Sequence, residues 1–194
     1  MKSKTTTFVI SIVVLVLLVI GLGVALNRPK GPSKYEDFVK SLVSNGAQFY
    51  GAFWCPHCQA EEKALEMSRQ ELESIGLYKE CSNADQSQTQ ICIDQKIESY
   101  PSWKFANGIT VNSPDENPTI CSAQPGKDGE AAICKQLASK YYPTYIFSNY
   151  QFSIKSPAAP VHTGTTWTFP ADAMTQGEIP LDFLAQQIGF TLPQ

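Results

Sequence analysis

The sequence predicts a mixed α/β domain, and three observations lead to that prediction. The apolar run at 49–54 has the length and composition of a buried strand. The tetrapeptide CPHC at Cys55–Cys58 follows at once and opens a stretch of strong helix formers at 59–67. Farther along, Pro101 stands at the head of a second β-rich run, 99–105. Alternating strand and helix segments of this kind place the chain in the α/β class.

The segment before this domain is apolar. Residues 8–26 carry no charge over nineteen positions, long enough for one helix to span a bilayer. A cleaved signal peptide is the alternative, although the run is longer than a usual signal h-region and no Ala-x-Ala site follows it. We therefore expect a cytoplasmic N-terminus at 1–7, a transmembrane anchor at 8–26, a breaker-rich linker at 27–33 and a folded domain at 34–194.

Cysteine usage and charge limit the possible compartments and partners. Six cysteines, an even number, in a small domain are typical of an oxidising compartment. The Lys and Arg residues on the two sides of the apolar run are nearly balanced and do not fix its orientation. The cysteines therefore favour a single-pass protein whose C-terminal domain is extracytoplasmic, either periplasmic or extracellular. A net charge of −3 argues against nucleic acid as a partner.

A helix is expected between the linker and the first strand. Ser33 and Glu36 have the spacing of a capping box. Four apolar residues share one face of this helix, which indicates a role in core packing: Phe38, Val39, Leu42 and Val43. The dipeptide Asn45-Gly46 is expected to end it.

The CPHC motif has the chemistry of a redox site. A thiolate at Cys55 would face the unpaired N–H groups of a helix N-terminus, which stabilise it, and Cys58, one turn on, could attack a mixed disulfide. Pro56 suits the first helical turn, and His57 places a potential cation beside the nucleophile. A CxxC pair at a strand-to-helix junction is typical of a thioredoxin-type thiol–disulfide oxidoreductase. We expect Cys55 to be the exposed nucleophile and Cys58 the resolving thiol.

Half of a structural zinc site is the alternative interpretation of the two cysteines. Zinc would need two more ligands at similar spacing, yet no second CxxC is present and the only other histidine is His162. We therefore expect neither a metal nor an organic cofactor, with the cysteines alone carrying disulfide exchange.

Four motifs give the chain a resemblance to a known family. They are FYGAFWCPHCQ at 49–59, Glu80-Cys81-Ser82, Ile91-Cys92 and YPSW at 100–103. Together they resemble the thioredoxin-like domain fused to bacterial vitamin K epoxide reductase homologues, and the related single-anchor thioredoxin-like and DsbA-like proteins. The resemblance covers roughly 34–107. It resumes near Thr166, where 167–170 and 177–185 look like the family's closing strand and helix.

This resemblance implies a thioredoxin-like fold and a redox-active Cys55–Cys58 pair. It also implies a Cys81–Cys92 disulfide, a cis-proline at Pro101 that shapes the substrate-facing surface, and a possible membrane redox partner resembling vitamin K epoxide reductase. The closing helix is predicted independently by Pro180 at its start and Gly189 as its stop.

Residues from about 109 to 165 depart from the family and are predicted to be an insertion. They repeat an earlier pattern. Cys121 is followed by a serine, as Cys81 is, and Cys134 is followed nine residues later by Pro143, just as Cys92 is followed by Pro101. We interpret the repeat as a partial duplication of a loop–helix–strand segment, which predicts a Cys121–Cys134 disulfide. Convergence of short motifs is the alternative.

Two further expectations concern the inserted residues. Either Pro101 or Pro143 could face the CPHC motif, and the shorter distance along the chain favours Pro101. Residues 153–164 are predicted to be an irregular loop. The aromatic residues of the insertion are expected to pack in the core more readily than to form a substrate groove: Tyr141, Tyr142, Tyr145, Phe147 and Tyr150.

The function that these observations favour is disulfide exchange with protein substrates. The Pro-His dipeptide between the cysteines resembles the oxidising DsbA type more than the reducing thioredoxin type, so an oxidant or isomerase is preferred. A disulfide reductase supplied with electrons by a partner is the first alternative. A redox-silent binding module that works through the inserted residues is the second.

Overall fold

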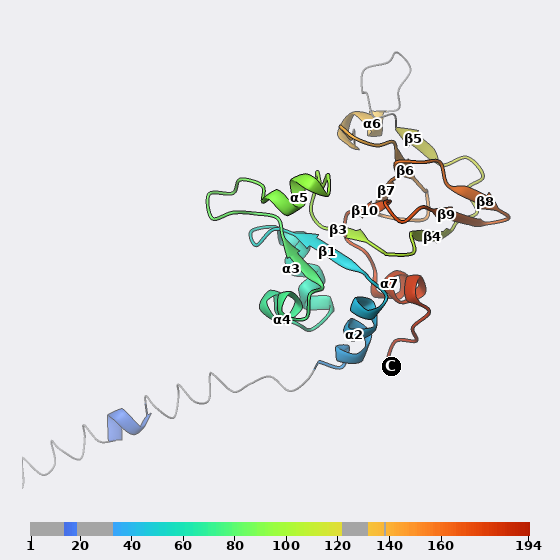
Figure 1. Cartoon of the computed structure of the whole chain (residues 1–194). Helices are drawn as coiled ribbons and strands as arrows, with labels where there is room; N and C mark the ends of the chain where they lie inside the picture. The colour runs from blue at the N-terminus through green and yellow to red at the C-terminus, as the bar shows by residue number, and fades with distance from the viewer. Residues whose placement is uncertain (1–13, 19–32, 122–131, 138) are drawn as a thin grey trace, which may run out of the picture. The chain divides into compact units, whose positions relative to one another are not determined.

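Seven strands form the central sheet of residues Ser33–Gln194, in the order β2-β1-β3-β10-β7-β6-β5 (Figure 1). The computed structural model describes residues 14–18, 33–121, 132–137 and 139–194. The strands of this sheet are β1 (Gln48–Gly51), β2 (Tyr78–Glu80), β3 (Ser102–Lys104), β5 (Thr119–Cys121), β6 (Thr144–Ile146), β7 (Ser153–Lys155) and β10 (Met174–Gln176). A second, antiparallel sheet has the order β4-β9-β8 and consists of β4 (Ile109–Asn112), β8 (Val161–Thr163) and β9 (Thr166–Phe169).

Strand β1 has a parallel neighbour, β2, on one side and an antiparallel neighbour, β3, on the other. The β1–β2 pair is the only parallel pair among the described strands of this sheet. Phe49 is in register with Tyr78 of β2, which runs parallel, and with Trp103 of β3, which runs antiparallel. Every later pair in the sheet is antiparallel, through β10, β7, β6 and β5. The parallel β1–β2 pair needs a crossover connection, and the helices α3 and α4 supply it.

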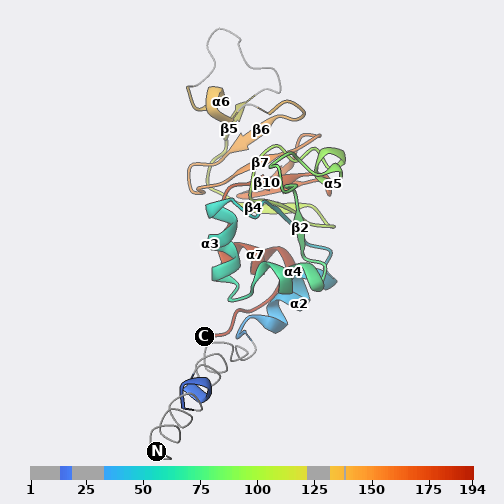
Figure 2. The same cartoon turned by 90° about the vertical axis from the view of Figure 1, so that its left-hand side faces the viewer.

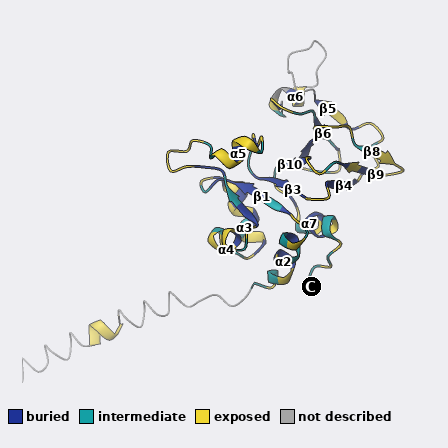
Figure 3. Ribbon diagram, viewed as in Figure 1, coloured by how far each residue is buried: buried dark blue, intermediate teal, exposed yellow. Residues whose placement is uncertain are grey.

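Helices cover both faces of this sheet (Figures 1 and 2). Four of them lie on one side, with α5 on the other side and α6 beside β5. Their bounds are α2 (Glu36–Ser44), α3 (Pro56–Ala64), α4 (Arg69–Ser74), α5 (Gln90–Asp94), α6 (Ala132–Leu137) and α7 (Leu181–Ile188). Helices α2, α3, α4 and α7 thus enclose one core. Helix α5 lies outside this core, and its outer surface is exposed (Figure 3).

Successive side chains of β1 point to opposite faces of the sheet and therefore enter two different cores. Phe49 packs in the large core with the apolar faces of the helices, whereas its neighbour Tyr50 packs in a smaller core on the opposite face. The smaller core contains Cys81, Cys92 and Met174. The disulfide-bonded helix α5 is therefore held against the face of the sheet that the other helices leave uncovered.

Helix α2 has the predicted apolar face, but its predicted cap is wrong. Phe38, Val39 and Leu42 are buried, as expected. No side-chain cap is formed, because the Ser33 hydroxyl donates to the carbonyl of Leu65 and accepts from the backbone N–H of Tyr35. A complete capping box forms instead at α4, between Ser68 and Glu71.

The residues predicted as an insertion enlarge the sheet. Strands β5, β6 and β7 extend it beyond β10, and β4 pairs with β9 in the second sheet. Residues 153–164 contain β7 and β8, so the prediction of an irregular loop there is wrong. The expected closing strand near Trp167 is β9 of the second sheet, and β10 occupies the place beside β3.

The closing helix begins and ends where the sequence predicts. Pro180 is the N-cap of α7, and Gly189 is the C-cap in the left-handed conformation, with φ of 65°. Glycine adopts this conformation without the steric cost of a Cβ atom, which explains the stop.

The predicted transmembrane anchor is contradicted. Of residues 8–26, only 14–18 belong to the described part of the chain, where they form a short exposed helical segment. Within the described residues, no helix is long and apolar enough to cross a membrane, since a span needs about 20 continuous helical residues. The single-pass localisation that we inferred from the apolar run is therefore wrong as well.

Candidate active site

The CPHC motif occupies the junction between β1 and α3. The chain leaves β1 at Gly51 and turns, and Cys55 then takes the N-cap position of α3 with an extended backbone conformation. Pro56 follows in the first helical turn, where the missing N–H of proline breaks no helical hydrogen bond. No side chain caps this N-terminus. The positive end of the helix dipole thus faces Cys55.

The Cys55 sulfur lies against the loop that precedes β3. Its Sγ atom is 3.6 Å from the carbonyl oxygen of Tyr100, to which the thiol donates a hydrogen bond. The Tyr100–Pro101 peptide bond is cis. The side chain of Cys55 is only 4 % exposed, so the expectation of an exposed nucleophile is wrong for this arrangement. The Tyr100 loop limits access to the sulfur because it contacts the sulfur directly.

Cys58 is fully buried one turn farther along α3. Burial raises the pKa of this thiol, and a hydrogen bond with Cys55 raises it further, whereas the backbone N–H of Ala52 acts in the opposite direction. Neither Cys55 nor Cys58 is in a disulfide in this structure. A resolving thiol in this environment needs a group that takes its proton.

Glu61 is a buried acid near the cysteines that the sequence analysis did not identify. It follows Cys58 by three residues and therefore projects from the same face of α3. Its two carboxylate oxygens accept hydrogen bonds from Trp103 Nε1, at 2.6 Å, and from the backbone N–H of Ile179, at 2.7 Å. Burial raises the pKa of Glu61 to about 8, although both hydrogen bonds oppose that shift. Its spacing from Cys58 was the one signal in the sequence.

A tyrosine hydroxyl adds a third polar group beneath the motif. The Tyr78 hydroxyl is buried and makes no hydrogen bond within the described residues. A Cβ atom at Gly51 would lie 2.7 Å from this hydroxyl and 3.0 Å from the Cys58 sulfur. Gly51 therefore leaves the space in which Tyr78 and Cys58 approach one another, and any larger residue there would displace them.

His57 is exposed and contacts a carboxylate. Its Nδ1 atom pairs with Oε1 of Glu178, which lies just before α7. The sequence analysis assigned His57 to the stabilisation of the Cys55 thiolate, and it did not foresee Glu178. The contact that the His57 ring makes in this structure is therefore with an acid.

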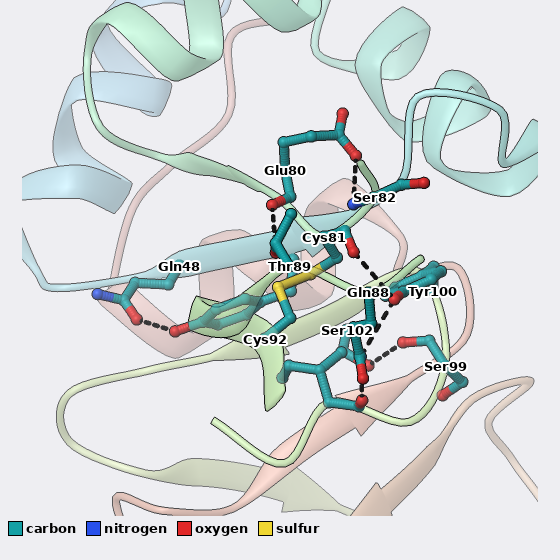
Figure 4. Close-up of a disulfide and its surroundings, with 12 residues drawn as sticks. Gln48, Glu80, Cys81, Ser82, Gln88, Thr89, Cys92, Ser99, Tyr100 and Ser102 are labelled. Carbon is teal, nitrogen blue, oxygen red and sulfur yellow. Dashed lines mark hydrogen bonds between the residues drawn. A yellow bond between two sulfur atoms is a disulfide. The ribbon is translucent and has the colours of Figure 1, made fainter. Parts of the chain in front are cut away.

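The first of two further disulfides supports the loop beside Cys55. Cys81 and Cys92 are joined at an S–S distance of 1.98 Å and are both buried (Figure 4). The Tyr100 hydroxyl donates to the carbonyl oxygen of Cys81 at 3.4 Å and accepts from Gln88 at 3.1 Å. The backbone of a disulfide-bonded cysteine and the Gln88 side chain thus hold Tyr100, the residue whose carbonyl contacts Cys55.

The second disulfide lies at the far edge of the sheet. Cys121, on the edge strand β5, is joined to Cys134 of α6 at an S–S distance of 2.06 Å. Pro143 precedes β6 there, and its carbonyl accepts the N–H of Ser156. Among the described residues, Pro101 is the proline that follows the residue in contact with Cys55.

Comparison with known proteins shows a similarity over part of the chain. No protein-family model matches the chain. The Arabidopsis thaliana protein "Thiol-disulfide oxidoreductase LTO1" is 32 % identical over 65 residues, which are 33 % of this chain and 17 % of that protein. This chain therefore matches about a sixth of the length of its relative. Over that length the chain is related to a thiol–disulfide oxidoreductase.

Proposed function

We propose that the chain is a thiol–disulfide oxidoreductase that exchanges disulfides with protein substrates through Cys55 and Cys58. The observation that carries the proposal is the position of the Cys55 sulfur, at the N-terminus of α3 and 3.6 Å from the carbonyl of Tyr100. A helix N-terminus stabilises the thiolate that disulfide exchange requires. The partial similarity to a thiol–disulfide oxidoreductase supports the same chemistry.

The proposed oxidation of a substrate proceeds in two exchanges. A substrate thiolate attacks the Cys55 sulfur of a Cys55–Cys58 disulfide, and Cys58 leaves as a thiolate that takes up a proton. A second substrate thiolate then attacks the substrate sulfur of the mixed disulfide, and Cys55 leaves as a thiolate. The substrate loses two electrons as its disulfide forms, and the cysteine pair gains them. Reduction of a substrate is the reverse sequence.

We propose that Glu61 is the proton carrier for Cys58. Burial disfavours the Cys58 thiolate, so the proton must be exchanged with a group that is also buried. Glu61 is on the same face of α3, and its pKa of about 8 lies close to neutral pH. A carrier with such a pKa can both accept and return a proton.

The preferred direction is that of an oxidant or isomerase. The helix N-terminus and His57 both favour the thiolate of Cys55 and so favour the reduced pair, which raises the reduction potential. The Glu178 carboxylate acts against His57, and this contact favours the alternative of a reductase supplied by a redox partner. Equilibration of the chain with glutathione separates the two, because an oxidant has a potential well above thioredoxin's value of about −270 mV.

Trapping of a mixed disulfide tests the proposal. Cys58→Ala removes the resolving thiol, so substrates should accumulate as mixed disulfides on Cys55, detected on non-reducing gels and by mass spectrometry. Cys55→Ala is the matched control and should trap little, while it lowers turnover of a dithiol substrate by at least about 10³-fold. If the unmodified chain turns over neither dithiols nor disulfides, the chain is a redox-silent binding module and the proposal is wrong.

A further inference from the structure

A cavity of about 380 Å³ opens beside Tyr100, on the side of the sheet that carries α5. One wall comes from the disulfide-bonded segment and includes Ile93 and Lys96. The other wall comes from the inserted residues and includes Lys140 and Tyr141. Because the Tyr100 carbonyl contacts the Cys55 sulfur, a chain that reacts with Cys55 passes next to this cavity.

Two lysines give the cavity a positive rim. Lys96 Nζ donates to the Tyr142 hydroxyl at 2.8 Å and lies 5.0 Å from the centre of that ring. Lys140 Nζ lies 5.5 Å from the centre of the Tyr141 ring. Neither ammonium group forms a salt bridge with a carboxylate in the part of the chain that the structure describes. Asp172 attracts Lys96 without forming an ion-pair contact, so both ammonium groups can still pair with a ligand.

The one acid in the cavity wall, Glu98, is already paired with donors from this chain. Its carboxylate accepts hydrogen bonds from Lys155 Nζ at 2.8 Å, from the Ser139 hydroxyl at 2.5 Å and from the backbone N–H of Lys140 at 2.7 Å. Burial alone would raise the pKa of Glu98, but these donors lower it, so the group is ionised and paired at neutral pH. The same contacts fasten the inserted wall to the loop before Pro101.

Apolar side chains accompany the two charges. Ile93 is 45 % exposed and Tyr141 is 39 % exposed at the cavity, although both are large apolar groups. On the other side of Tyr100, the Trp54 ring packs edge-on at 6.0 Å and is 43 % exposed. Exposed aromatic groups next to unpaired cations are typical of a surface that binds polypeptide.

We propose that this cavity binds an acidic stretch of the substrate polypeptide, a few residues away from the cysteine that reacts with Cys55. The inference rests on the proposed function and adds the class of substrate to it. Carboxylates of the substrate pair with Lys96 and Lys140, and apolar side chains beside them contact Ile93 and Tyr141. An extended chain advances about 3.3–3.6 Å per residue, so only a short stretch is needed to fill such a cavity.

Peptide selectivity tests the inference. Three peptides share one pair of cysteines and carry, three to six residues away on either side, two glutamates, two glutamines or two lysines. The full chain should show a kcat/KM about fivefold higher for the glutamate peptide than for the lysine peptide at low salt, through KM, and the ratio should shrink as salt screens the charges. Lys96→Glu with Lys140→Glu should reverse this preference.

The control places one Lys→Glu change outside the cavity wall. Lys34 also lies over a tyrosine ring, that of Tyr35, at 4.8 Å, so Lys34→Glu removes a similar cation–tyrosine contact and should keep the wild-type preference. Equal kcat/KM values for all three peptides, or an equal loss for all three in the double variant, would overturn the inference. Turnover of glutathione by the unmodified chain is measured in parallel. If the proposed function is wrong, the chain turns over no substrate at all, whereas a failure of this inference alone leaves the turnover of glutathione intact.

Discussion

Residues 81–101 and 121–143 share a local plan but have different neighbours. In each segment a strand ends at or just before the first cysteine, a short helix carries the second, and a proline precedes the next strand. The flanking strands differ in their pairing, since β2 and β3 lie on opposite sides of β1, whereas β5 pairs with β6 directly. The shared sequence pattern therefore builds a similar corner in both places, consisting of the strand end, the disulfide-bonded helix and the proline. The sheet around the corner is not repeated.

The difference between the two corners lies in their distance from the CPHC motif. The first corner contains Tyr100, whose carbonyl contacts Cys55. The second corner is at the sheet edge and reaches the first through Ser139 and Lys140, which donate to Glu98. A disulfide and a proline at fixed spacing thus occur in both corners, but only the first corner contacts Cys55, where the proposed disulfide exchange takes place.

Removal of each disulfide should give the largest contrast between the corners. The two bridges close loops of similar size, with sequence separations of 11 and 13, so replacing either pair by serine should lower the free energy of unfolding by about 3 kcal/mol. Only loss of Cys81–Cys92 should also lower the turnover of the folded protein, by about tenfold, because Tyr100 donates to Cys81. Urea unfolding and turnover per folded molecule measure the two effects. Equal losses of turnover would show that the corners do not differ in function.

Two acids with shifted pKa values, the buried Glu61 and the paired Glu98, should sharpen the comparison through the pH dependence of stability. The pKa of Glu61 is raised to about 8, so its stabilising contribution is complete below its ordinary value of 4.5 and is lost as pH rises to 8, by up to ~1.4 kcal/mol per pH unit. The pKa of Glu98 is lowered, because Lys155 and Ser139 outweigh burial. Its contribution is present above its ordinary value and is lost as pH falls through the folded pKa.

Matched amide variants separate these two acids. Glu61→Gln should reduce the loss of stability between pH 5 and 8, and Glu98→Gln should reduce the loss below about pH 4.5. Urea unfolding of both variants and the wild type from pH 3.5 to 8.5 provides the measurement. A constant difference between Glu61→Gln and the wild type from pH 5 to 8 would contradict the assignment of a raised pKa to this acid.

The smallest expected effect is a change in the reduction potential when the exposed pair of His57 and Glu178 is altered. His57→Ala should lower the potential, because it removes the side chain to which the proposal assigns support of the Cys55 thiolate. Glu178→Gln should raise it, because it removes a negative charge beside the CPHC motif, and nearby negative charge disfavours a thiolate. Shifts on the order of 10–20 mV are expected for such exposed charges, measured by equilibration with glutathione. Shifts of the same sign in both variants would exclude a role for the His57–Glu178 pair.

Features that depend on a few neighbouring residues could be predicted from the sequence. The start of α3 at Pro56 and the end of α7 at Gly189 follow from backbone constraints of single residues. The apolar face of α2 follows from its periodicity. The N-terminal cap of α2 could not be predicted in this way, because the Ser33 hydroxyl donates to the distant carbonyl of Leu65 and does not cap the helix.

Features that depend on distant segments could not be predicted. Strand β10 has only three residues, and its place beside β3 depends on partners that are distant in the sequence. Thr175, for example, is in register with Trp103, 72 positions earlier. The burial of Glu61 depends on Trp103 and Ile179, neither of which is close to it in the sequence. Strand pairing and side-chain burial arise from tertiary packing, which weak local propensities do not determine.

The pairing of Lys155 with Glu98 bears on whether residues 109–165 could be cut out as a module. Lys155, on β7, is 3 % exposed, and Glu98 belongs to the loop before Pro101. A shortened chain without the inserted residues would leave this carboxylate without its three donors and leave β10 without its neighbour β7. The inserted residues therefore support the loop before Pro101 and the strand beside β3, so their removal is expected to disturb the surroundings of Cys55 as well.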